Sequence, residues 1–455
     1  MRNTILSLEQ EKIILRGNEI RPADTECDCR FLFKNTVDKS NEQGGTSMSI
    51  LKKNNGPMSK GPSIQSISGD HWSELKFTDG IMTDAIMKHV MGLCYLGMAD
   101  AGEAFEVVSR LNDKETDSWE NTWADLASKL KTRAQNSEKN EKKISASTAY
   151  LRASTYYRMA TMYMDNVHSP RMAEYTRQSF DCYEKSMELS GYPGKYVEIP
   201  YEGTYLPGHF YTSPCAKKDK APILVLTPGR DTWAVDTRWI FDAALKRGIH
   251  CITYDGPGQG YALRFQDMKF RPDWEKVMGP VLDYVETIDC VDMDHVACMG
   301  FSFGGFLMPR VAAFDKRIKL IITDPGNISW GKGIGERLAM IQKMPSRMRP
   351  KFMNVMIEDY AWKHGVPEEA VVDELKKYDN TKILDKVECE VLVLDGTAEM
   401  TFGAAKELYD ALVNAKNKDY ILFDDDSTAQ CHTQMGGYAT GAETIMDWLE
   451  DHIDS

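Results

Sequence analysis

One serine lies in a sequence context that could make it a nucleophile. The stretch 300–305 reads GFSFGG, which places Ser302 in a G-x-S-x-G pattern. An apolar run of strand character, 296–299, precedes it, and apolar residues at helical spacing follow it. A sharp strand–turn–helix holds the serine in a strained conformation and exposes its Oγ at the end of a sheet. The pattern therefore predicts a nucleophilic Ser302, with a helix-capping serine in an inactive protein as the alternative.

A nucleophile of this kind needs a base, and chain order narrows the search. When the order is serine, acid, histidine, the histidine follows the last strands. Only His432 and His452 lie beyond the apolar run 391–394. His452 falls in a helical pattern near the end of the chain, whereas His432 falls in a loop followed by Gly436 and Gly437. We expect His432 to be the general base.

The acid that orients the histidine has three candidates. After the run 391–394 the chain reads DGTAE, which places a carboxylate at Asp395 and another at Glu399. A glutamate can hold the imidazole tautomer and stabilise the imidazolium as an aspartate does. We favour Glu399 over Asp395, with Asp324, after the preceding strand, third.

An oxyanion hole requires two N–H groups directed at the developing negative charge. One should be the backbone N–H of Phe303, directly after the nucleophile. The other should come from the loop 227–231, and we assign it to the backbone of Arg230, whose side chain we expect to be solvated or paired. Asp231 in the same loop and Tyr157 are candidate substrate contacts. The sequence offers no metal site.

The elements that would position these residues follow from hydrophobic periodicity. Short apolar runs alternate with helical segments, which is typical of a buried parallel sheet covered by helices on both faces. The expected strands are 223–226, 250–254, 296–299, 320–323, 391–394 and 420–423, preceded by an antiparallel pair at 197–201 and 206–211. With the serine motif, this order predicts an α/β fold of the α/β-hydrolase class, at 193–455.

Three further segments surround that catalytic domain. Residues 71–192 predict a helical N-terminal cap, with helices at 81–98, 119–135, 144–164 and 170–189. Residues 1–70 are rich in polar residues and glycine over 39–70, so we expect this segment to be disordered or loosely docked. A helical insertion at about 329–382 is expected to act as a second piece of lid. A tetratricopeptide array is the weaker interpretation of the cap, because no third repeat follows.

Composition excludes several classes of partner. A net charge of −13 argues against nucleic acid and anionic membranes as partners. The ten cysteines have no framework spacing, so we expect free thiols in a reducing compartment. No run approaches the roughly 18 apolar residues of a membrane span, and the N-terminus lacks a signal-peptide pattern, so we expect a cytoplasmic protein.

The glycine-rich turn at 255–260 lacks the G-x-G-x-x-G spacing, which favours a structural turn over phosphate binding.

Several motifs together resemble one family. They read YLRASTYYR at 150–158, YDGPGQG at 254–260, FRPDWE at 270–275 and GFSFGG at 300–305, followed by Pro309 and Arg310. This combination is similar to the FrsA-like α/β-hydrolases over about residues 75–455. Within the family it is similar to the fungal polyketide-shortening heptaketide hydrolase, to fusarin and cytochalasan pathway hydrolases, and to bacterial 2,6-dihydroxypseudooxynicotine hydrolase.

The resemblance implies a Ser-acid-His triad, a helical cap and no cofactor. It matches Ser302 and His432 to the nucleophile and base, while Glu399 stands in place of the family's aspartate. It also implies an apolar, polyketide-like small-molecule substrate that is cleaved at an ester or an activated C–C bond. Acyl transfer or ring closure by the same triad and a non-catalytic scaffold are the alternatives, and a homodimer is left open.

Overall fold

The computed structural model describes residues 72–112 and 117–453. The expectation for segment 1–70 therefore lies outside the described residues. A central sheet of eight strands has the order β1-β2-β4-β3-β5-β6-β7-β8. The strands are β1 (Gly194–Tyr201), β2 (Thr204–Tyr211), β3 (Ala221–Thr227), β4 (His250–Tyr254), β5 (Val291–Phe301), β6 (Leu320–Asp324), β7 (Glu390–Gly396) and β8 (Lys418–Phe423).

In antiparallel register, β1 pairs with β2 and β2 pairs with β4, and every other pairing is parallel. The six predicted parallel strands and the predicted antiparallel pair all form. Four of the parallel strands, β3, β4, β6 and β7, are buried on both faces along most of their length, which explains why their sequences read as continuous apolar runs. The prediction of an α/β-hydrolase fold is confirmed.

Alternate residues of each strand pack into different layers. Leu224 and Leu226 of β3 join one hydrophobic cluster, and Ile223 and Val225 join the other. The helices of the first layer are α6 (Arg238–Lys246) and α14 (Tyr438–His452). Those of the second layer are α8 (Glu275–Glu286), α9 (Phe303–Phe314) and α13 (Ala404–Ala411). A short helix, α7 (Gly260–Gln266), follows β4.

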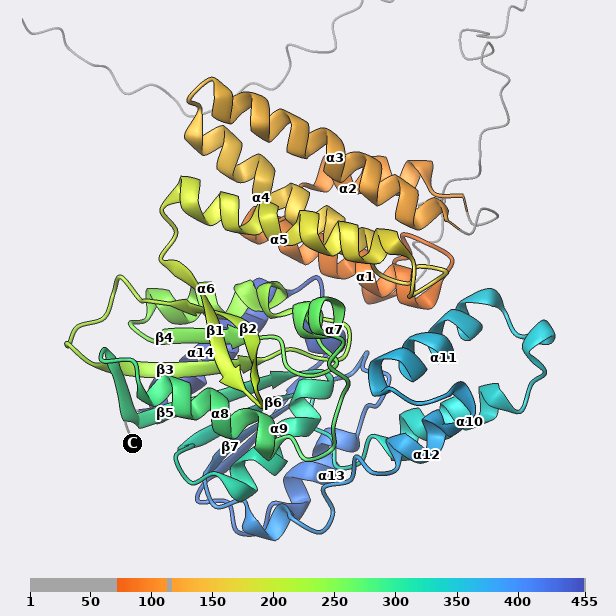
Figure 1. The fold of residues 1–455 in the computed structure, drawn as a ribbon. Coiled ribbons are helices and arrows are strands. Elements are labelled where there is room, and N and C mark those ends of the chain that lie inside the picture. Colours follow the sequence, from red (N-terminus) through yellow and green to blue (C-terminus); the bar gives the residue numbers. More distant parts are fainter. Residues whose placement is uncertain (1–71, 113–116, 454–455) are drawn as a thin grey trace, which may run out of the picture. The chain divides into compact units, whose positions relative to one another are not determined.

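Among the described residues before the sheet, the chain forms five α-helices, called the cap below (Figure 1). They are α1 (Ile81–Leu93), α2 (Ala101–Arg110), α3 (Ser118–Lys139), α4 (Lys143–Ala160) and α5 (Pro170–Ser190). The periodicity did not predict α2, although an aspartate stands at its N-cap: Asp100 accepts a hydrogen bond from the Glu103 N–H at 3.1 Å. The predicted helix 144–164 was too long: α4 ends at Ala160, and the chain turns at Tyr163, whose φ is 53°.

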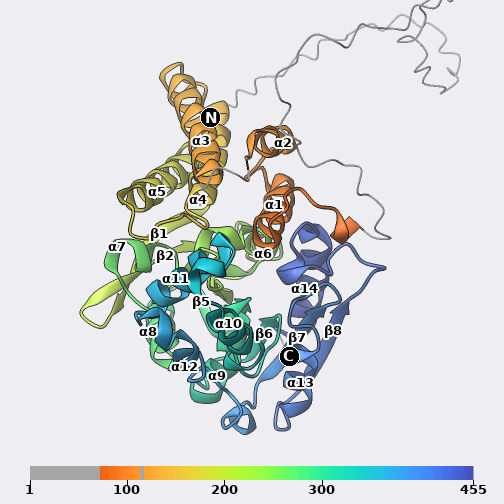
Figure 2. The same ribbon diagram turned by 90° about the vertical axis from the view of Figure 1, so that its right-hand side faces the viewer.

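Buried polar contacts join the cap to the sheet layer. Arg158 of α4 forms an ion pair with Asp236 at 2.7 Å, and both side chains are almost fully buried. The Tyr183 and Tyr211 hydroxyls lie 2.9 Å apart, which links α5 to β2. Figure 2 shows α1 close to α14. A Cβ at Gly92 of α1 would lie 2.6 Å from the Tyr438 ring, so this glycine permits that approach.

A helical segment, called the insertion below, separates β6 from β7, as the sequence predicted. It contains α10 (Glu336–Gln342), α11 (Lys351–His364) and α12 (Val371–Leu375). Figure 1 shows these helices beyond the end of the sheet that carries the β6–β7 connection. Within residues 72–112 and 117–453, no helix combines the length and hydropathy that crossing a membrane requires.

Candidate active site

Ser302 lies between β5 and α9 in a backbone conformation that few non-glycine residues adopt. Its φ is 55° and its ψ is −118°. The turn closes tightly: a Cβ at Gly300 would lie 2.1 Å from the carbonyl oxygen of Gly304, and one at Gly304 would lie 2.5 Å from that of Thr227. Side chains at these positions would prevent the turn, so the glycines of the motif have a steric cause.

The three residues expected to form a triad lie together. Nε2 of His432 is 2.9 Å from Oγ of Ser302, and Nδ1 of His432 is 2.5 Å from Oε2 of Glu399. Ser302 comes from the end of β5, Glu399 from the loop after β7 and His432 from the loop after β8. The arrangement can pass a proton from the serine to an imidazole that a carboxylate orients.

The Glu399 carboxylate is buried and charged in this arrangement. Burial by itself raises its pKa, but the charge of His432 and the hydrogen bond to it outweigh burial, and the pKa of Glu399 is lowered. The same contact acts on the partner: burial opposes protonation of His432, and Glu399 nevertheless raises its pKa. The pair therefore favours an ionised glutamate and a basic imidazole.

The other two acid candidates have different partners. Asp395 accepts hydrogen bonds from the backbone N–H groups of Gly396 at 2.9 Å and Gly403 at 3.1 Å, and from the Tyr420 hydroxyl at 3.1 Å. These contacts hold the loop after β7. Asp324 accepts a hydrogen bond from the Gln434 side chain rather than from the histidine.

Asp324 connects the nucleophile to the histidine loop. Its backbone carbonyl accepts the Ser302 N–H at 2.5 Å, and its Oδ1 accepts the Gln434 amide at 2.9 Å. Gln434 and Thr433 have φ values of 55° and 48°, so the turn after His432 is strained and needs such an anchor. Burial raises the pKa of Asp324 to about 7.

The two proposed oxyanion donors lie beside the serine. Phe303 directly follows it. The loop after β3 packs so closely on the turn at Ser302 that a Cβ at Gly229 would lie 2.8 Å from Cβ of Ser302. Among the hydrogen bonds of the described residues, none uses the backbone N–H of Phe303 or of Arg230. Neither N–H thus has a partner among those bonds, which is what an oxyanion donor requires.

A cavity of about 410 Å³ opens onto Ser302, His432 and Glu399. Its walls come from the loops of the sheet, from the cap and from the insertion. The cap and insertion side chains in the wall are mainly apolar or aromatic: Ile81, Met82, Ala85, Ile86, Met162, Tyr163, Trp330, Ile334, Leu338, Ile341, Met356 and Tyr360. Both helical segments therefore contribute to the wall of the cavity at Ser302.

A buried network of charges forms one part of the wall. Arg230 pairs with Asp231 at 2.9 Å and with Asp359, and its guanidinium lies 3.8 Å from the centre of the Tyr360 ring. Lys363 of the insertion bonds to Asp231 at 2.6 Å and to Asp359 at 2.9 Å. Burial raises the pKa of Asp231, but Arg230 and Lys363 outweigh it and lower that pKa. The Arg230 side chain is thus paired, as the sequence analysis expected.

The structure places one candidate substrate contact in the cavity wall and not the other. Asp231 lines the cavity, whereas Tyr157 is absent from its lining and stacks on Tyr175 inside the cap. The next residue, Arg158, faces the cavity instead. The expectation for Tyr157 is corrected in this respect, because successive residues of a helix point about 100° apart.

Sequence reasoning also missed His89 of α1. It lines the cavity, and its Nδ1 lies 2.5 Å from the Tyr438 hydroxyl. Burial lowers the pKa of His89 to about 4, so the ring is neutral. A lone histidine in an amphipathic helix gives no signal for this position, because only the packing of α1 on α14 brings it to the cavity.

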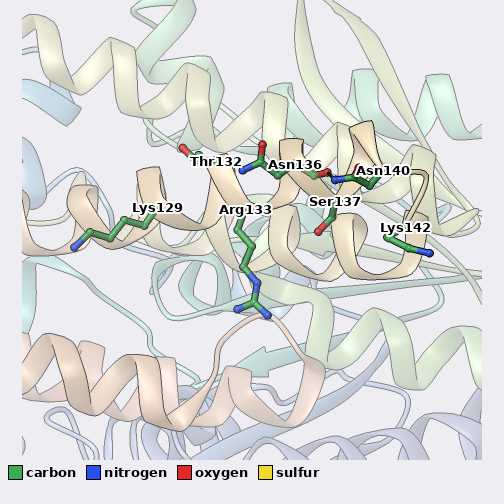
Figure 3. Close-up of a pocket in the computed structure, with 7 residues that line it drawn as sticks. All are labelled: Lys129, Thr132, Arg133, Asn136, Ser137, Asn140 and Lys142. Carbon is green, nitrogen blue, oxygen red and sulfur yellow. Dashed lines mark hydrogen bonds between the residues drawn. The ribbon is translucent and has the colours of Figure 1, made fainter.

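A separate hollow on the cap has a different character. It lies along the C-terminal half of α3 and the turn into α4, and its volume is about 730 Å³ (Figure 3). The side chains around it are polar or basic and almost all exposed: Lys129, Thr132, Arg133, Asn136, Ser137, Asn140 and Lys142. It contains no member of the triad, so we assign the chemistry to the cavity at Ser302.

Comparison with known proteins identifies the family. The family model described as esterase FrsA-like matches residues 107–454. The chain belongs to the FrsA-like family. It is accordingly a hydrolase of the α/β type, and the resemblance inferred from its motifs is confirmed.

Individual relatives agree with this assignment. The FrsA-like chain is 28% identical over 404 residues to the alpha/beta hydrolase psoB of Aspergillus fumigatus, covering 78% of this chain and 89% of that protein. It is 33% identical over 238 residues to the 20-hydroxy-prefusarin hydrolase FUS2 of Gibberella moniliformis, covering 50% of this chain and 56% of that protein. The crystal structure of 2,6-dihydroxy-pseudo-oxynicotine hydrolase shares the fold, with a TM-score of 0.65, 19% identity, and coverage of 80% of this chain and 95% of that one.

Proposed function

We propose that this FrsA-like protein is a serine hydrolase in which Ser302 is the nucleophile, His432 the general base and Glu399 the orienting acid. The observation that carries the proposal is the continuous hydrogen-bonded path from Ser302 Oγ through the imidazole to Glu399 Oε2, with separations of 2.9 and 2.5 Å. The reaction uses no cofactor in this proposal, since the nucleophile, the base and the oxyanion donors all belong to the chain.

The chemistry follows from the positions of these groups. Ser302 Oγ attacks a substrate carbonyl carbon while His432 Nε2 accepts the hydroxyl proton. The backbone N–H groups of Phe303 and Arg230 stabilise the oxyanion. Collapse of the intermediate breaks the bond to the leaving group, which takes the proton from His432. Water, activated by the same imidazole, then releases the acyl group from Ser302 as a carboxylic acid.

The leaving group can be an alcohol or a stabilised carbon. In an ester it departs as an alcohol. In a β-diketone it departs as an enolate, whose charge the second carbonyl delocalises, and protonation then gives a ketone. Both reactions use the same triad and the same oxyanion donors, so the catalytic geometry permits either.

The cavity supports an apolar small molecule as substrate. Methionine, isoleucine and aromatic side chains from the cap and the insertion form much of its wall. A relative carries the name 20-hydroxy-prefusarin hydrolase and a structural neighbour that of 2,6-dihydroxy-pseudo-oxynicotine hydrolase. These names agree with a role in the metabolism of small organic molecules, and we propose a polyketide-like substrate of a secondary-metabolite pathway.

The proposal is tested by comparing the full chain with its Ser302→Ala variant on apolar aryl esters and on an enolisable β-diketone. Products are followed by mass spectrometry in water labelled with heavy oxygen. We expect label in the carboxylic acid from the wild-type protein and a rate at least about 10³-fold lower in the variant. Equal rates in the two proteins would refute the serine mechanism, and an acylated acceptor formed in place of the labelled acid would replace hydrolysis by acyl transfer to another nucleophile.

A further inference from the structure

A second cavity adjoins the one at Ser302. It has a volume of about 240 Å³ and lies between the start of α1, the ends of α2 and α4, the start of α3 and the first turns of α11. Figure 1 locates these elements where the cap meets the insertion. Four residues line both cavities: Ile81, Met82, Tyr163 and Met356. The two spaces are therefore neighbours separated by shared side chains.

The partition is made largely of side chains that can adapt. Met82 and Met356 are unbranched and reorient at little cost. Ile81 is 71% exposed, so few contacts hold it in place. Tyr163 is the fixed member, since its backbone has a φ of 53°, a conformation that a bulky residue adopts only when its surroundings impose it. Rotation of the methionines would join the two cavities beside this ring.

The wall of the second cavity offers mainly apolar contact. Its apolar members beyond the partition are Leu111, Trp119, Phe352 and Val355. Several polar groups of the wall already have partners: the hydroxyls of Thr78 and Thr83 lie 2.7 Å apart, and Trp119 Nε1 donates to the Met159 carbonyl at 2.9 Å.

The remaining polar side chains of the wall include one buried hydroxyl and one ion pair. Ser118 Oγ accepts the Asn112 N–H at 2.8 Å, and Lys351 of the insertion pairs with Asp165 of the cap. Phe352 follows Lys351 in the sequence, is 51% exposed and adds an apolar surface to the wall of the cavity. An occupant would gain from burying hydrocarbon here and would find few unpaired polar groups to satisfy.

We infer that the second cavity is a subsite for the distal apolar end of an elongated substrate whose reacting carbonyl lies at Ser302. This inference rests on the proposed function and adds the shape of the substrate to it. The subsite would make catalytic efficiency depend on chain length, because only a long acyl chain can pass Met82 and Met356 and reach Val355 and Phe352.

The experiment compares decanoyl and acetyl p-nitrophenyl esters on the full-length enzyme and three variants. Val355→Trp fills the second cavity, and Phe352→Ser removes an exposed apolar contact without disturbing the core. Met348→Trp is the matched control, because it places the same large ring on the same insertion at a position that is 64% exposed and outside both cavities.

We expect the ratio of kcat/KM for decanoyl over acetyl ester to fall about tenfold in Val355→Trp and severalfold in Phe352→Ser, with the loss mainly in KM. The acetyl ester should react within about twofold of wild type in all three variants. An unchanged ratio in both cavity variants, or an equal fall in Met348→Trp, would overturn the inference.

A binding measurement separates this inference from the proposed mechanism. Ser302→Ala serves as the background, and the probe is dansyl-undecanoic acid, followed by its fluorescence. Addition of Val355→Trp should weaken probe binding about tenfold, and addition of Met348→Trp should leave it unchanged. Retained binding in the Val355→Trp background refutes the subsite, whereas failure of the serine mechanism appears separately as full activity of Ser302→Ala.

Discussion

Oε2 of Glu399 lies 2.5 Å from Nδ1 of His432, in a carboxylate that is almost completely buried. The preceding carboxylate in the sequence, Asp395, accepts hydrogen bonds from backbone N–H groups of its own loop. The longer glutamate side chain thus reaches the imidazole from a position four residues farther along the loop. Because the two carboxylates have different partners, substitution of each should have a different effect.

Glu399→Gln should reduce kcat by about 10³–10⁴-fold, because an amide cannot stabilise the imidazolium and favours the wrong tautomer. Steady-state kinetics with an aryl ester measure this. Asp395→Asn is the comparison: it should reduce kcat by less than about tenfold and lower the free energy of unfolding by about 1–3 kcal/mol, since one acceptor oxygen becomes a donor facing N–H or O–H groups. A greater kcat loss in Asp395→Asn would reverse the assignment.

The pH dependence of kcat/KM should report the environment of His432. Burial works against the protonated ring, but Glu399, Asp324 and Asp231 outweigh it and raise its pKa above 6.5. Because the base must be neutral, activity should be lost as the pH falls through this raised pKa. Glu399→Gln should move the midpoint of the acid limb to lower pH.

Asp324 provides the control for that pH profile, since its pKa of about 7 falls in the same range. The acid limb should persist in Asp324→Asn, shifted slightly to lower pH by the loss of one negative charge. Disappearance of the limb in this variant would show that Asp324, and not His432, is the group that titrates.

Gly300→Ala should prevent the tight turn between β5 and α9 from forming, and so affect stability as well as catalysis. The new Cβ would lie 2.1 Å from the Gly304 carbonyl oxygen, which belongs to backbone that cannot move aside. We expect loss of activity together with a lower midpoint of thermal unfolding. Gly279→Ala is the matched control, because a Cβ there meets no atom within 4 Å. A fully stable and active Gly300→Ala protein would contradict the tight turn.

Removal of the buried ion pair between cap and sheet layer should destabilise the protein. Arg158→Met leaves Asp236 buried without its partner, which should cost about 3–5 kcal/mol in the free energy of unfolding. Arg110→Met breaks an ion pair whose side chains are more than a third exposed and should cost about 0–1 kcal/mol. Denaturant unfolding monitored by circular dichroism compares them, and equal losses would argue against a structural role for the Arg158 pair.

The fold could be predicted from the sequence because its signals are local. Each parallel strand, such as 223–226, is a short apolar run, and the serine motif sits directly after one of them. Chain order then led to His432 and Glu399, which the structure brings together. Helix α2 was missed although it has apolar residues at helical spacing, because it is only ten residues long and carries a glycine in its first turn. Helix α4 was extended because nothing local reveals the left-handed conformation of Tyr163.

The walls of the cavity could not be predicted in the same way. Arg158 and Asp236 are 78 positions apart, and Lys363 and Asp231 are 132 apart, with no periodicity that connects them. The helical pattern of α4 identified a buried face but did not decide between Tyr157 and Arg158 for the cavity. Such contacts depend on how the cap and the insertion pack over the sheet, and that packing is a tertiary property.

Labelling with a fluorophosphonate probe shows whether Ser302 is an activated nucleophile, because the probe phosphonylates a serine that a base activates. The intact full-length protein is treated, and peptide mass spectrometry locates the adduct. We expect one adduct, on Ser302, with none in Ser302→Ala and strongly slowed labelling in His432→Ala. An adduct on another residue, or undiminished labelling in His432→Ala, would contradict the assignment of Ser302 and His432 as nucleophile and base.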